Sequence, residues 1–303
     1  MNADDPPQGS ASATTAVLKF GGEVVADRSA LISVLRDVER LVGLGWRFVI
    51  CHGGGPQAGA LQARVGLETI KVGGRRVTDA ATLQIMKYVL AGEVSVDVVA
   101  AAAAVGLRAV GVSGVSANVV TASRRPPVMV SGGGSEPVDF GFVGDVERVE
   151  ADLLRHLWAG GYTPVLNTLG IATRPTTEGE PCGVFNINAD TVASAVAGAL
   201  SADHLFLMTD VPGVLRDKDD PSTRIPRLHA SEARDAIASG VIVGGMIPKV
   251  EDALGQLAGE GGTVGAVHIL GAAPGALEAA ARSPGERGTV LLPDSGSVRT
   301  PIV

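Results

Sequence analysis

Aromatic residues are scarce in this 303-residue sequence, at 3% of the chain, although hydrophobic residues make up 46% of it. The core must therefore be built from Ala, Val, Leu and Ile, a composition typical of helices packed on a mostly parallel sheet of apolar strands. Long apolar runs are lacking as well. The most apolar segment, 98–107, lies between Asp97 and Arg108 and is too short to span a bilayer, so we expect no membrane partner.

Positive charge is in deficit, because 25 Lys and Arg residues stand against 32 Asp and Glu residues and give a net charge of −7. With no basic block and few aromatic rings to stack on bases, we expect no nucleic-acid partner. Cysteine is nearly absent, and Cys51 and Cys182 stand in neither a CxxC nor a metal-ligand spacing. This pattern predicts reduced thiols, a cytoplasmic location and no metal held by the protein itself.

The two ends of the chain differ in composition from the middle. Residues 1–15 are rich in Pro, Ser and small residues and lack the basic start and apolar stretch of a signal peptide, so we expect a disordered tail there and a second one at 293–303. Within 16–292, apolar runs alternate with helical patterns. The strand candidates are 16–20, 47–51, 109–112, 164–166, 205–208 and 264–270, and the helix candidates include 80–105, 190–200, 231–238 and 246–258.

This alternation predicts an α/β fold, a three-layer αβα sandwich around a mainly parallel sheet. Residues 67–78 and 118–147 interrupt it with short β-branched pieces, Gly and Pro, and predict β-hairpins laid over one edge. Asp27 is a candidate N-cap for the helical pattern that follows it, and Asp190 is one for the helix at 190–200.

Glycine follows two of the expected strands directly. Lys19 and Gly21-Gly22 close the first strand, and residues 52–56, His-Gly-Gly-Gly-Pro, close the second and open a helix. Because ligands of open parallel sheets bind beyond the carboxyl ends of the strands, and glycine lets backbone N–H groups approach an anion, both loops fit phosphate or carboxylate. Neither loop has the GxxxxGK[ST] or GxGxxG pattern, so a P-loop and a Rossmann dinucleotide site are excluded.

In combination and order, these features resemble the amino-acid-kinase family over about residues 16–292. Five further segments carry the resemblance: GRRVTD at 74–79, VSG at 112–114, GFVG at 141–144, NINAD at 186–190 and GMIPK at 245–249. The resemblance implies ATP-dependent phosphorylation of a carboxylate, with the side chain of N-acetyl-L-glutamate as the expected acceptor in arginine biosynthesis. A related acceptor such as an aminoadipate derivative, or a non-catalytic amino-acid sensor on the same fold, are the alternatives.

The resemblance also implies roles for particular residues. Lys19 and Lys249 would stabilise the transferring phosphoryl group, and Asp190 would organise both lysines. The residues implied for the acceptor are Gly54, Gly55, Arg76, Asn186 and Asn188. The residues implied for ATP are Gly21, Gly22, Asp210, Val211, Pro212, Gly213, Val214, Leu215, Val241, Ile242 and Val243. Mg²⁺ is expected to arrive on ATP, held mainly by phosphates and water.

The resemblance further implies an N-terminal lobe, about 16–188, for the acceptor and dimerisation, and a C-terminal lobe, about 189–292, for ATP. We expect a homodimer, paired through the helix at 80–105. A hexamer is disfavoured, because residues 1–15 lack the amphipathic stripe of the helix that links dimers in arginine-inhibited members. Glu23 stands where the family often has Asn, and we expect its carboxylate to point away from the phosphates or to form a salt bridge. Arg75, beside Arg76, is expected to be solvated.

Overall fold

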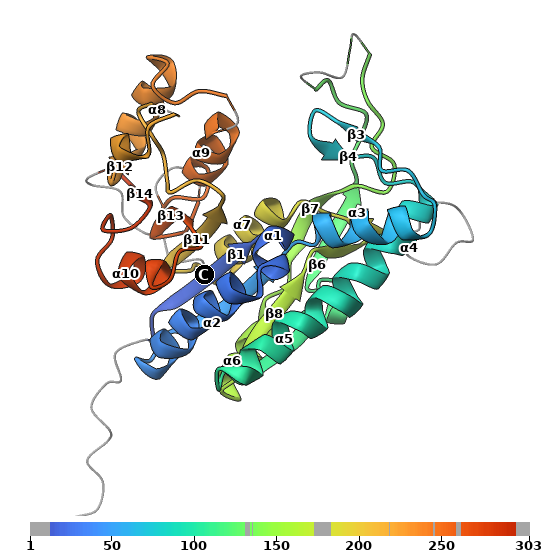
Figure 1. Ribbon diagram of the computed structural model, residues 1–303, viewed down its shortest axis with the longest axis horizontal. Helices are drawn as coiled ribbons and strands as arrows, with labels where there is room; N and C mark the ends of the chain where they lie inside the picture. The colour runs from blue at the N-terminus through green and yellow to red at the C-terminus, as the bar shows by residue number, and fades with distance from the viewer. Residues whose placement is uncertain are drawn as a thin grey trace, which may run out of the picture.

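An eight-stranded sheet forms the centre of the molecule in the computed structural model, which describes residues 13–130, 134, 136–172, 183–217, 219–244, 246–258 and 262–294 (Figure 1). The strand order is β12-β14-β13-β11-β1-β2-β8-β5, and every neighbouring pair is parallel except β13 and β14. The strands are β1 (Thr15–Phe20), β2 (Arg47–His52), β5 (Ala109–Ser113), β8 (Thr163–Asn167), β11 (His204–Thr209), β12 (Arg227–His229), β13 (Ala266–Gly271) and β14 (Thr289–Leu292). The predicted mainly parallel sheet is confirmed.

Helices cover both faces of this sheet, and each face has its own hydrophobic core (Figure 1). One face packs against α1 (Gly22–Ala26), α2 (Arg28–Gly43), α3 (Gly55–Arg64), α4 (Ala80–Tyr88), α5 (Ser95–Ala104) and α10 (Ala276–Arg282). The other face packs against α6 (Asp152–Ala159), α7 (Ala189–Leu200), α8 (Ala230–Ala238) and α9 (Met246–Leu254). These three layers confirm the predicted αβα sandwich.

The central strand β1 shows why apolar runs form the sheet. Its side chains are buried except those of Thr15 and Lys19, which are half-buried. Because successive side chains of a strand point to opposite faces, Val17 joins one hydrophobic core and Leu18 the other. Lys19 lies opposite Cys51 of β2 and Leu207 of β11. The carboxyl ends of β1, β2 and β11 therefore meet at one edge of the sheet.

The predicted helix at 80–105 is one helical run in three parts. A π-helical segment, η1 (Val89–Val94), joins α4 to α5. Two short 3₁₀ helices, η2 (Ser116–Asn118) and η3 (Pro221–Thr223), lie in loops. In the described part of the chain, none of the helices combines the length and the apolar character needed to cross a membrane.

Two helix starts test the capping predictions. The Asp27 side chain accepts hydrogen bonds from the N–H groups of Ser29 and Ala30 at the start of α2, as predicted. The prediction that Asp190 caps α7 is wrong. Asn188 is the N-cap, and its Oδ1 accepts hydrogen bonds from Asp190 N at 2.7 Å and Thr191 N at 3.4 Å. The carboxylate of Asp190 is therefore left for another partner.

Two smaller sheets lie outside the central one. The hairpin of β3 (Lys71–Val72) and β4 (Arg75–Arg76) is antiparallel, and a four-stranded sheet has the order β10-β9-β6-β7. Its strands are β6 (Val120–Arg124), β7 (Gly144–Val149), β9 (Leu169–Ala172) and β10 (Val184–Asn186). Because β6 and β7 pair antiparallel, both predicted hairpin regions are confirmed. β9, β10, β12 and β14 were missed, since three or four residues are too few to show a strand pattern.

Parts of both predicted tails are described. Thr15 is the first residue of β1, and the carbonyl of Pro293 hydrogen-bonds to His229 Nδ1 at 2.9 Å. Asp294 Oδ1 accepts hydrogen bonds from the backbone and hydroxyl of Ser231. These contacts fasten residues 293 and 294 to the start of α8. Thr14 is described too, and its carbonyl accepts a hydrogen bond from Arg47 N at 2.9 Å. Residues 1–12 and 295–303 of the predicted tails, and Cys182, lie outside the described residues.

Candidate active site

Lys19, at the end of the central strand, forms an ion pair with Asp190 at the start of α7. Lys19 Nζ lies 2.8 Å from Asp190 Oδ1, and the two side chains are only 13% and 29% exposed. The pair joins the first expected glycine loop to the NINAD segment, and Lys19 and Asp190 are 171 positions apart in the chain. An ion pair this sheltered from water is electrostatically stronger than an exposed one, and removing either partner leaves a charge without compensation.

Lys249, on α9, approaches the same edge from the other side. Its Nζ donates a hydrogen bond to Thr209 Oγ1 at 2.8 Å, and Thr209 Oγ1 in turn donates to Asp210 Oδ1 at 2.8 Å. The bond from Thr209, helped by the positive charge of Lys249, lowers the pKa of Asp210. Lys249 and Asp190 both line a cavity of about 20 Å³, called here the small cavity. Asp190 forms an ion pair with Lys19. Lys249 and Asp190 line the same small cavity, but no described hydrogen bond or ion pair joins them directly.

The two predicted glycine loops face each other, and their glycines are required by close packing. A Cβ on Gly22 would collide with Gln57 and Pro56 at the start of α3. A Cβ on Gly54, the N-cap of α3, would lie 2.9 Å from Leu90 Cδ2 of the π-helical segment. Only glycine therefore allows the loops to pack this closely on α3 and η1. The loops bring the positive end of the α3 helix dipole to the edge where Lys19 ends.

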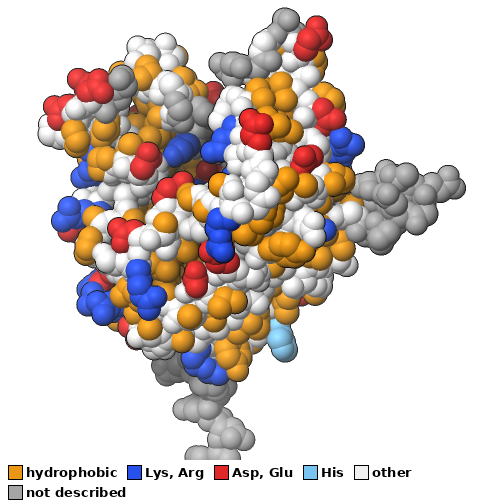
Figure 2. Space-filling view, turned by 45° about the vertical axis from the view of Figure 1, so that its right-hand side comes forward, with side chains coloured by type: hydrophobic (Ala, Val, Ile, Leu, Met, Phe, Trp, Pro, Cys, Tyr) orange, Lys and Arg blue, Asp and Glu red, His pale blue; other side chains and the backbone are white. Residues whose placement is uncertain are grey.

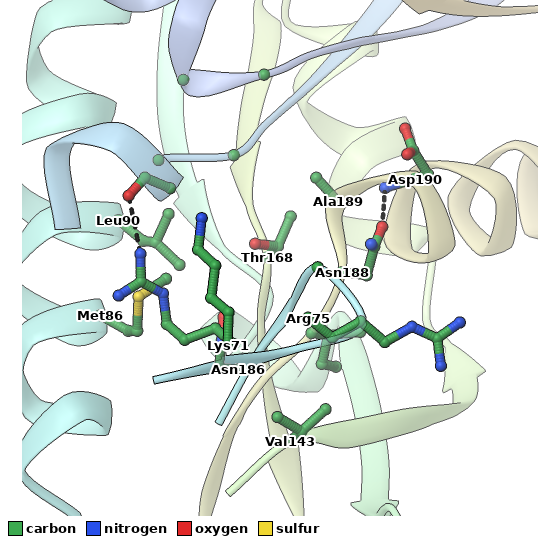
Figure 3. Close-up of a pocket in the computed structure, with 18 of the residues that line it drawn as sticks. Lys71, Arg75, Met86, Leu90, Val143, Thr168, Asn186, Asn188, Ala189 and Asp190 are labelled. Carbon is green, nitrogen blue, oxygen red and sulfur yellow. Dashed lines mark hydrogen bonds between the residues drawn. The ribbon is translucent and has the colours of Figure 1, made fainter. Parts of the chain in front are cut away.

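These loops form one wall of a cavity of about 370 Å³, called here the glycine-loop cavity. Its lining includes all five residues implied for the acceptor and four further predicted site residues, namely Gly54, Gly55, Arg76, Asn186 and Asn188 with Lys19, Gly21, Gly22 and Asp190. Figure 3 shows the start of α7, with Asn188 and Asp190, on the opposite side of this cavity from Met86 and Leu90. The structure thus brings together the residues implied for the acceptor and the Lys19–Asp190 pair.

Arg76 is held in place by polar groups behind it. One guanidinium nitrogen donates to Gln62 Oε1 and to Thr69 Oγ1, and the other donates to the carbonyl of Gly55 at 3.0 Å. Partial burial lowers the pKa of Arg76. A guanidinium is not deprotonated in proteins, so the group is a cation. Asn186 Nδ2 donates to Thr78 Oγ1 at 3.3 Å. Both side chains are therefore fixed by the fold before any ligand arrives.

A separate cavity of about 420 Å³, called here the apolar cavity, has mostly hydrophobic walls. It is lined by Asp210, Val211, Gly213, Leu215, Val241, Ile242, Val243, Gly244, Met246 and Lys249. Two of the residues implied for ATP, Pro212 and Val214, are not in this lining, and Val214 is fully buried with its N–H bonded to Thr289 Oγ1. Pro212 and the buried Val214 interrupt the run of residues that line the cavity, so not all of 210–215 can face one ligand.

Lys249 lines both the apolar cavity and the small cavity, and Asp190 lines both the small cavity and the glycine-loop cavity. The three cavities therefore follow one another along the edge of the sheet. Sequence reasoning gave no role to three basic residues of the glycine-loop cavity, Lys71, Arg75 and Arg125. Arg125 pairs with Asp145 at 2.6 Å, and the other two are residues of the β3–β4 hairpin. Their positions depend on hairpin packing, which no local sequence pattern reveals.

Glu23 does not lie as expected. Its carboxylate lies over Gly21 and lines the glycine-loop cavity, and no described salt bridge holds it. The physical reason is local: Glu23 is in the first turn of α1, where the positive end of the helix dipole favours an acidic side chain. His52 is fully buried, and burial lowers its pKa to about 4, so it is neutral at pH 7. In the described residues, no group of three or more His, Cys, Asp or Glu side chains could hold a metal ion.

A basic, glycine-rich cavity and an apolar cavity, linked through Lys19, Asp190 and Lys249, are an arrangement suited to phosphoryl transfer in a kinase without a P-loop. Residues 14–267 match the amino acid kinase family. The chain belongs to this family.

Curated relatives and solved structures agree with this assignment. The chain is 50% identical over 282 residues to an acetylglutamate kinase of Anaeromyxobacter dehalogenans strain 2CP-1, covering 92% of this chain and 99% of that protein. It is 49% identical to an acetylglutamate kinase of Sorangium cellulosum strain So ce56, covering 91% of this chain and 94% of that protein. The crystal structure of smu.665 from Streptococcus mutans UA159 is similar with a TM-score of 0.69 at 26% identity, covering 92% of this chain and 98% of that one.

Proposed function

We propose that this protein is an ATP-dependent kinase that phosphorylates the side-chain carboxylate of N-acetyl-L-glutamate. The products are ADP and N-acetyl-L-glutamyl 5-phosphate, and the reaction is the second step of arginine biosynthesis. The observation that carries the proposal is the Lys19–Asp190 pair between the glycine-loop cavity and the small cavity that Lys249 enters. The acetylglutamate kinases at 49–50% identity, matched over nearly their whole length, supply the choice of acceptor.

The acceptor occupies the glycine-loop cavity in this proposal. Arg76 grips its α-carboxylate, because a guanidinium matches a carboxylate with two parallel hydrogen bonds. Gln62, Thr69 and the Gly55 carbonyl hold Arg76 still, so little side-chain freedom is lost on binding. Asn186 and Asn188 bind the amide portion, and Gly54 and Gly55 leave room for the substrate to lie against backbone N–H groups.

Phosphoryl transfer then needs no general base, because the acceptor carboxylate is already ionised at neutral pH. One carboxylate oxygen attacks the γ-phosphorus, the bond from that phosphorus to the β–γ bridging oxygen breaks, and its electron pair leaves with ADP. Lys19 and Lys249 stabilise the negative charge that spreads over the transferring group and the leaving oxygen. Asp190 orients the two ammonium groups, and backbone N–H groups of Gly21, Gly22 and Gly54 complete the anion site.

The nucleotide occupies the apolar cavity, with its phosphates directed toward Lys249. The predominantly hydrophobic lining suits a nucleobase, and Lys249 is the lining cation that also reaches the small cavity. The lining offers no cage of oxygen ligands, so Mg²⁺ enters on the nucleotide, held mainly by phosphates and water. Mg²⁺ supplies charge neutralisation of the phosphates when it is bound.

The protein acts in the cytoplasm as a homodimer in this proposal, with an N-terminal lobe of about 16–188 for the acceptor and a C-terminal lobe of about 189–292 for ATP. The helical run α4–η1–α5 supports the pairing, because Tyr88 and Val96 on it are 58% and 62% exposed. A hexamer remains disfavoured. Light scattering gives the mass in solution and tests the dimer.

The experiment that tests the function is a hydroxamate-trapping assay with ATP and a panel of acceptors. Acyl phosphates react with hydroxylamine, so only a true carboxyl kinase gives the coloured hydroxamate. We expect product with N-acetyl-L-glutamate, and much less with free glutamate, N-acetylaspartate or an N-acylated aminoadipate. A stronger signal with the aminoadipate derivative would move the assignment to that acceptor. No product with any acceptor, together with tight amino-acid binding by calorimetry, would favour the sensor.

A further inference from the structure

Arg125 is a second guanidinium in the glycine-loop cavity, and the reaction proposed above gives it no role. It directly follows β6, and its N–H donates to the carbonyl of Val143 at 2.9 Å. Arg125 and Val143 both line the cavity, whereas Arg124, the last residue of β6, does not. Because successive side chains of an extended chain point to opposite sides, the Arg124 side chain is 54% exposed and that of Arg125 only 17%.

Asp145 of β7 holds the Arg125 guanidinium from outside the cavity. Arg125 Nε and Nη2 donate to Asp145 Oδ1 at 2.8 and 2.6 Å, and Asp145 is not among the described residues that line the cavity. No hydrogen bond within the described residues uses the other terminal nitrogen, Nη1. A guanidinium that is held along one edge keeps its charge and has donors left on the other edge. Arg125 is therefore a cation fixed in the cavity wall before any ligand arrives.

The wall that carries Arg125 also carries Asn186. Val143, whose carbonyl accepts from Arg125, pairs with Asn186 in a parallel β-bridge. Arg76 is held elsewhere, by groups that include the Gly55 carbonyl at the start of α3. In the proposed binding mode Arg76 grips the α-carboxylate and Asn186 meets the amide portion of the acceptor. The substituent on the α-nitrogen therefore lies on the side of the cavity where Arg125 is.

The charges of the cavity are distributed unevenly. Among its described lining residues five are basic and two, Glu23 and Asp190, are acidic. Both acids lie at the end of β1, since Glu23 lies over Gly21 and Asp190 pairs with Lys19. Figure 1 shows the β3–β4 hairpin, which carries three of the basic residues, on one of two projections of the molecule, and Figure 2 shows charged side chains on both sides of the hollow between these projections. The wall around Arg125 thus offers no carboxylate among its described lining residues to attract an ammonium group.

We propose that Arg125 makes the acceptor site specific for N-acylated amino acids over free amino acids. This inference rests on the proposed function and names the residue that recognises the substituent on the α-nitrogen. Nη1 of Arg125 donates a hydrogen bond to the acyl carbonyl oxygen. The same fixed charge repels the α-ammonium group that a free amino acid carries at neutral pH. One group therefore strengthens binding of the acylated acceptor and weakens binding of its unacylated competitor.

Calorimetric titration with three ligands of equal chain length separates the two effects. N-acetyl-L-glutamate carries the acyl group, L-glutamate carries the ammonium group, and glutarate carries neither. The wild type should bind N-acetyl-L-glutamate most tightly, glutarate next and L-glutamate least. In Arg125→Met the preference for N-acetyl-L-glutamate over glutarate should fall about 10-fold, because a charge-assisted hydrogen bond is lost. The preference for glutarate over L-glutamate should fall about three- to tenfold, because a like charge is removed.

Two further variants sharpen the test. Arg125→Lys keeps the charge but not the fixed fork of donors, so it should retain the preference for glutarate over L-glutamate and lose part of the preference for N-acetyl-L-glutamate. Arg124→Met is the matched control, because Arg124 also pairs with an aspartate, Asp139, but is exposed and outside the described lining. It should change neither preference.

The outcomes separate this inference from the proposed function. Equal losses of affinity for all three ligands in Arg125→Met, or a wild type that does not prefer N-acetyl-L-glutamate to L-glutamate, would overturn the role of Arg125 in specificity. Arg125 would then only support the cavity wall. A wild type that binds N-acetyl-L-glutamate selectively but phosphorylates no acceptor would refute the kinase, while the two binding preferences would still decide the role of Arg125.

Discussion

The glycine-loop cavity and the apolar cavity lie on the same edge of one sheet but are built in opposite ways. The first is walled by glycines and charged side chains whose positions are fixed by hydrogen bonds, as Arg76 shows. The second is walled mainly by aliphatic side chains on loops between strands and helices. A small charged acceptor offers little apolar area, so its binding depends on exact polar geometry. A nucleobase offers a large flat surface, so its binding tolerates variation in the wall.

This difference predicts in which of the two cavities a single substitution should weaken substrate binding more. On the acceptor side one displaced group removes a hydrogen bond that nothing else replaces. On the nucleotide side one lost contact removes a fraction of a shared apolar surface. Variants of the two cavities should therefore differ in the size of the effect and in which kinetic constant responds.

The largest effect is expected at the centre, where the two cavities meet. Lys19→Met should lower kcat about 10²- to 10³-fold, because the transferring phosphoryl group loses a preorganised cation and Asp190 is left unpaired. The KM values for both substrates should change much less. Steady-state kinetics with saturating ATP measure this. Lys87→Met, at an exposed lysine of α4, is the control, and a similar loss there or near-normal turnover in Lys19→Met would remove Lys19 from the mechanism.

The next largest effect is expected on the acceptor side. Arg76→Lys should raise the KM for the acceptor about 10²-fold, because an ammonium cannot reproduce the two parallel hydrogen bonds of a guanidinium or its anchoring to Gln62 and Gly55. The KM for ATP should stay within about twofold. Initial rates with each substrate varied in turn separate the two constants. Equal increases in both would mean that Arg76 supports the whole site rather than the acceptor cavity.

The sequence predicted most of the sheet, and the residues that it assigned to the acceptor lie together in one cavity, because both carry local signals. A strand followed by Lys19 and Gly21-Gly22 can be recognised as a candidate ligand site from its own sequence. Because β1 and β2 are parallel neighbours, the end of β1 then lies beside the loop at 52–56. Asn188 was assigned to the acceptor although its carbonyl oxygen caps α7. Asn188 both caps α7 and lines the glycine-loop cavity, and the sequence pattern does not reveal that one side chain has both roles.

The positions of several other side chains could not be predicted from the sequence, because they depend on how distant segments pack against each other. Asp252 has no local motif, and its place beside Asp190 follows from how α9 lies on the sheet. Likewise the burial of Val214 depends on Thr289 of β14, a strand too short to be recognised. Glu23 was expected to avoid the site on electrostatic grounds, yet the start of α1 holds it there.

A smaller effect is expected where backbone packing shapes the acceptor cavity. Gly54→Ala would place a Cβ 2.9 Å from Leu90 Cδ2 and 3.2 Å from Val94 Cγ2, so the loop must shift by a few tenths of an ångström. We expect kcat/KM for the acceptor to fall about 10-fold, since misplacement and overpacking of this size are costly. Adding Leu90→Ala should recover part of the loss. Gly43→Ala, which meets no atom within 4 Å, is the control.

The smallest effect is expected in the wall of the apolar cavity. Met246→Ala removes one flexible apolar side chain from a lining of several, so the KM for ATP should rise about five- to tenfold, the size expected for the loss of roughly 1 kcal/mol of apolar contact. The KM for the acceptor should not change, and Met129→Ala, at a methionine that is 60% exposed, should change neither. A Met246→Ala effect as large as that of Arg76→Lys would break the contrast between the two cavities. It would mean that the nucleotide, like the acceptor, depends on single contacts because α9 must be placed accurately for Lys249 to reach the phosphates.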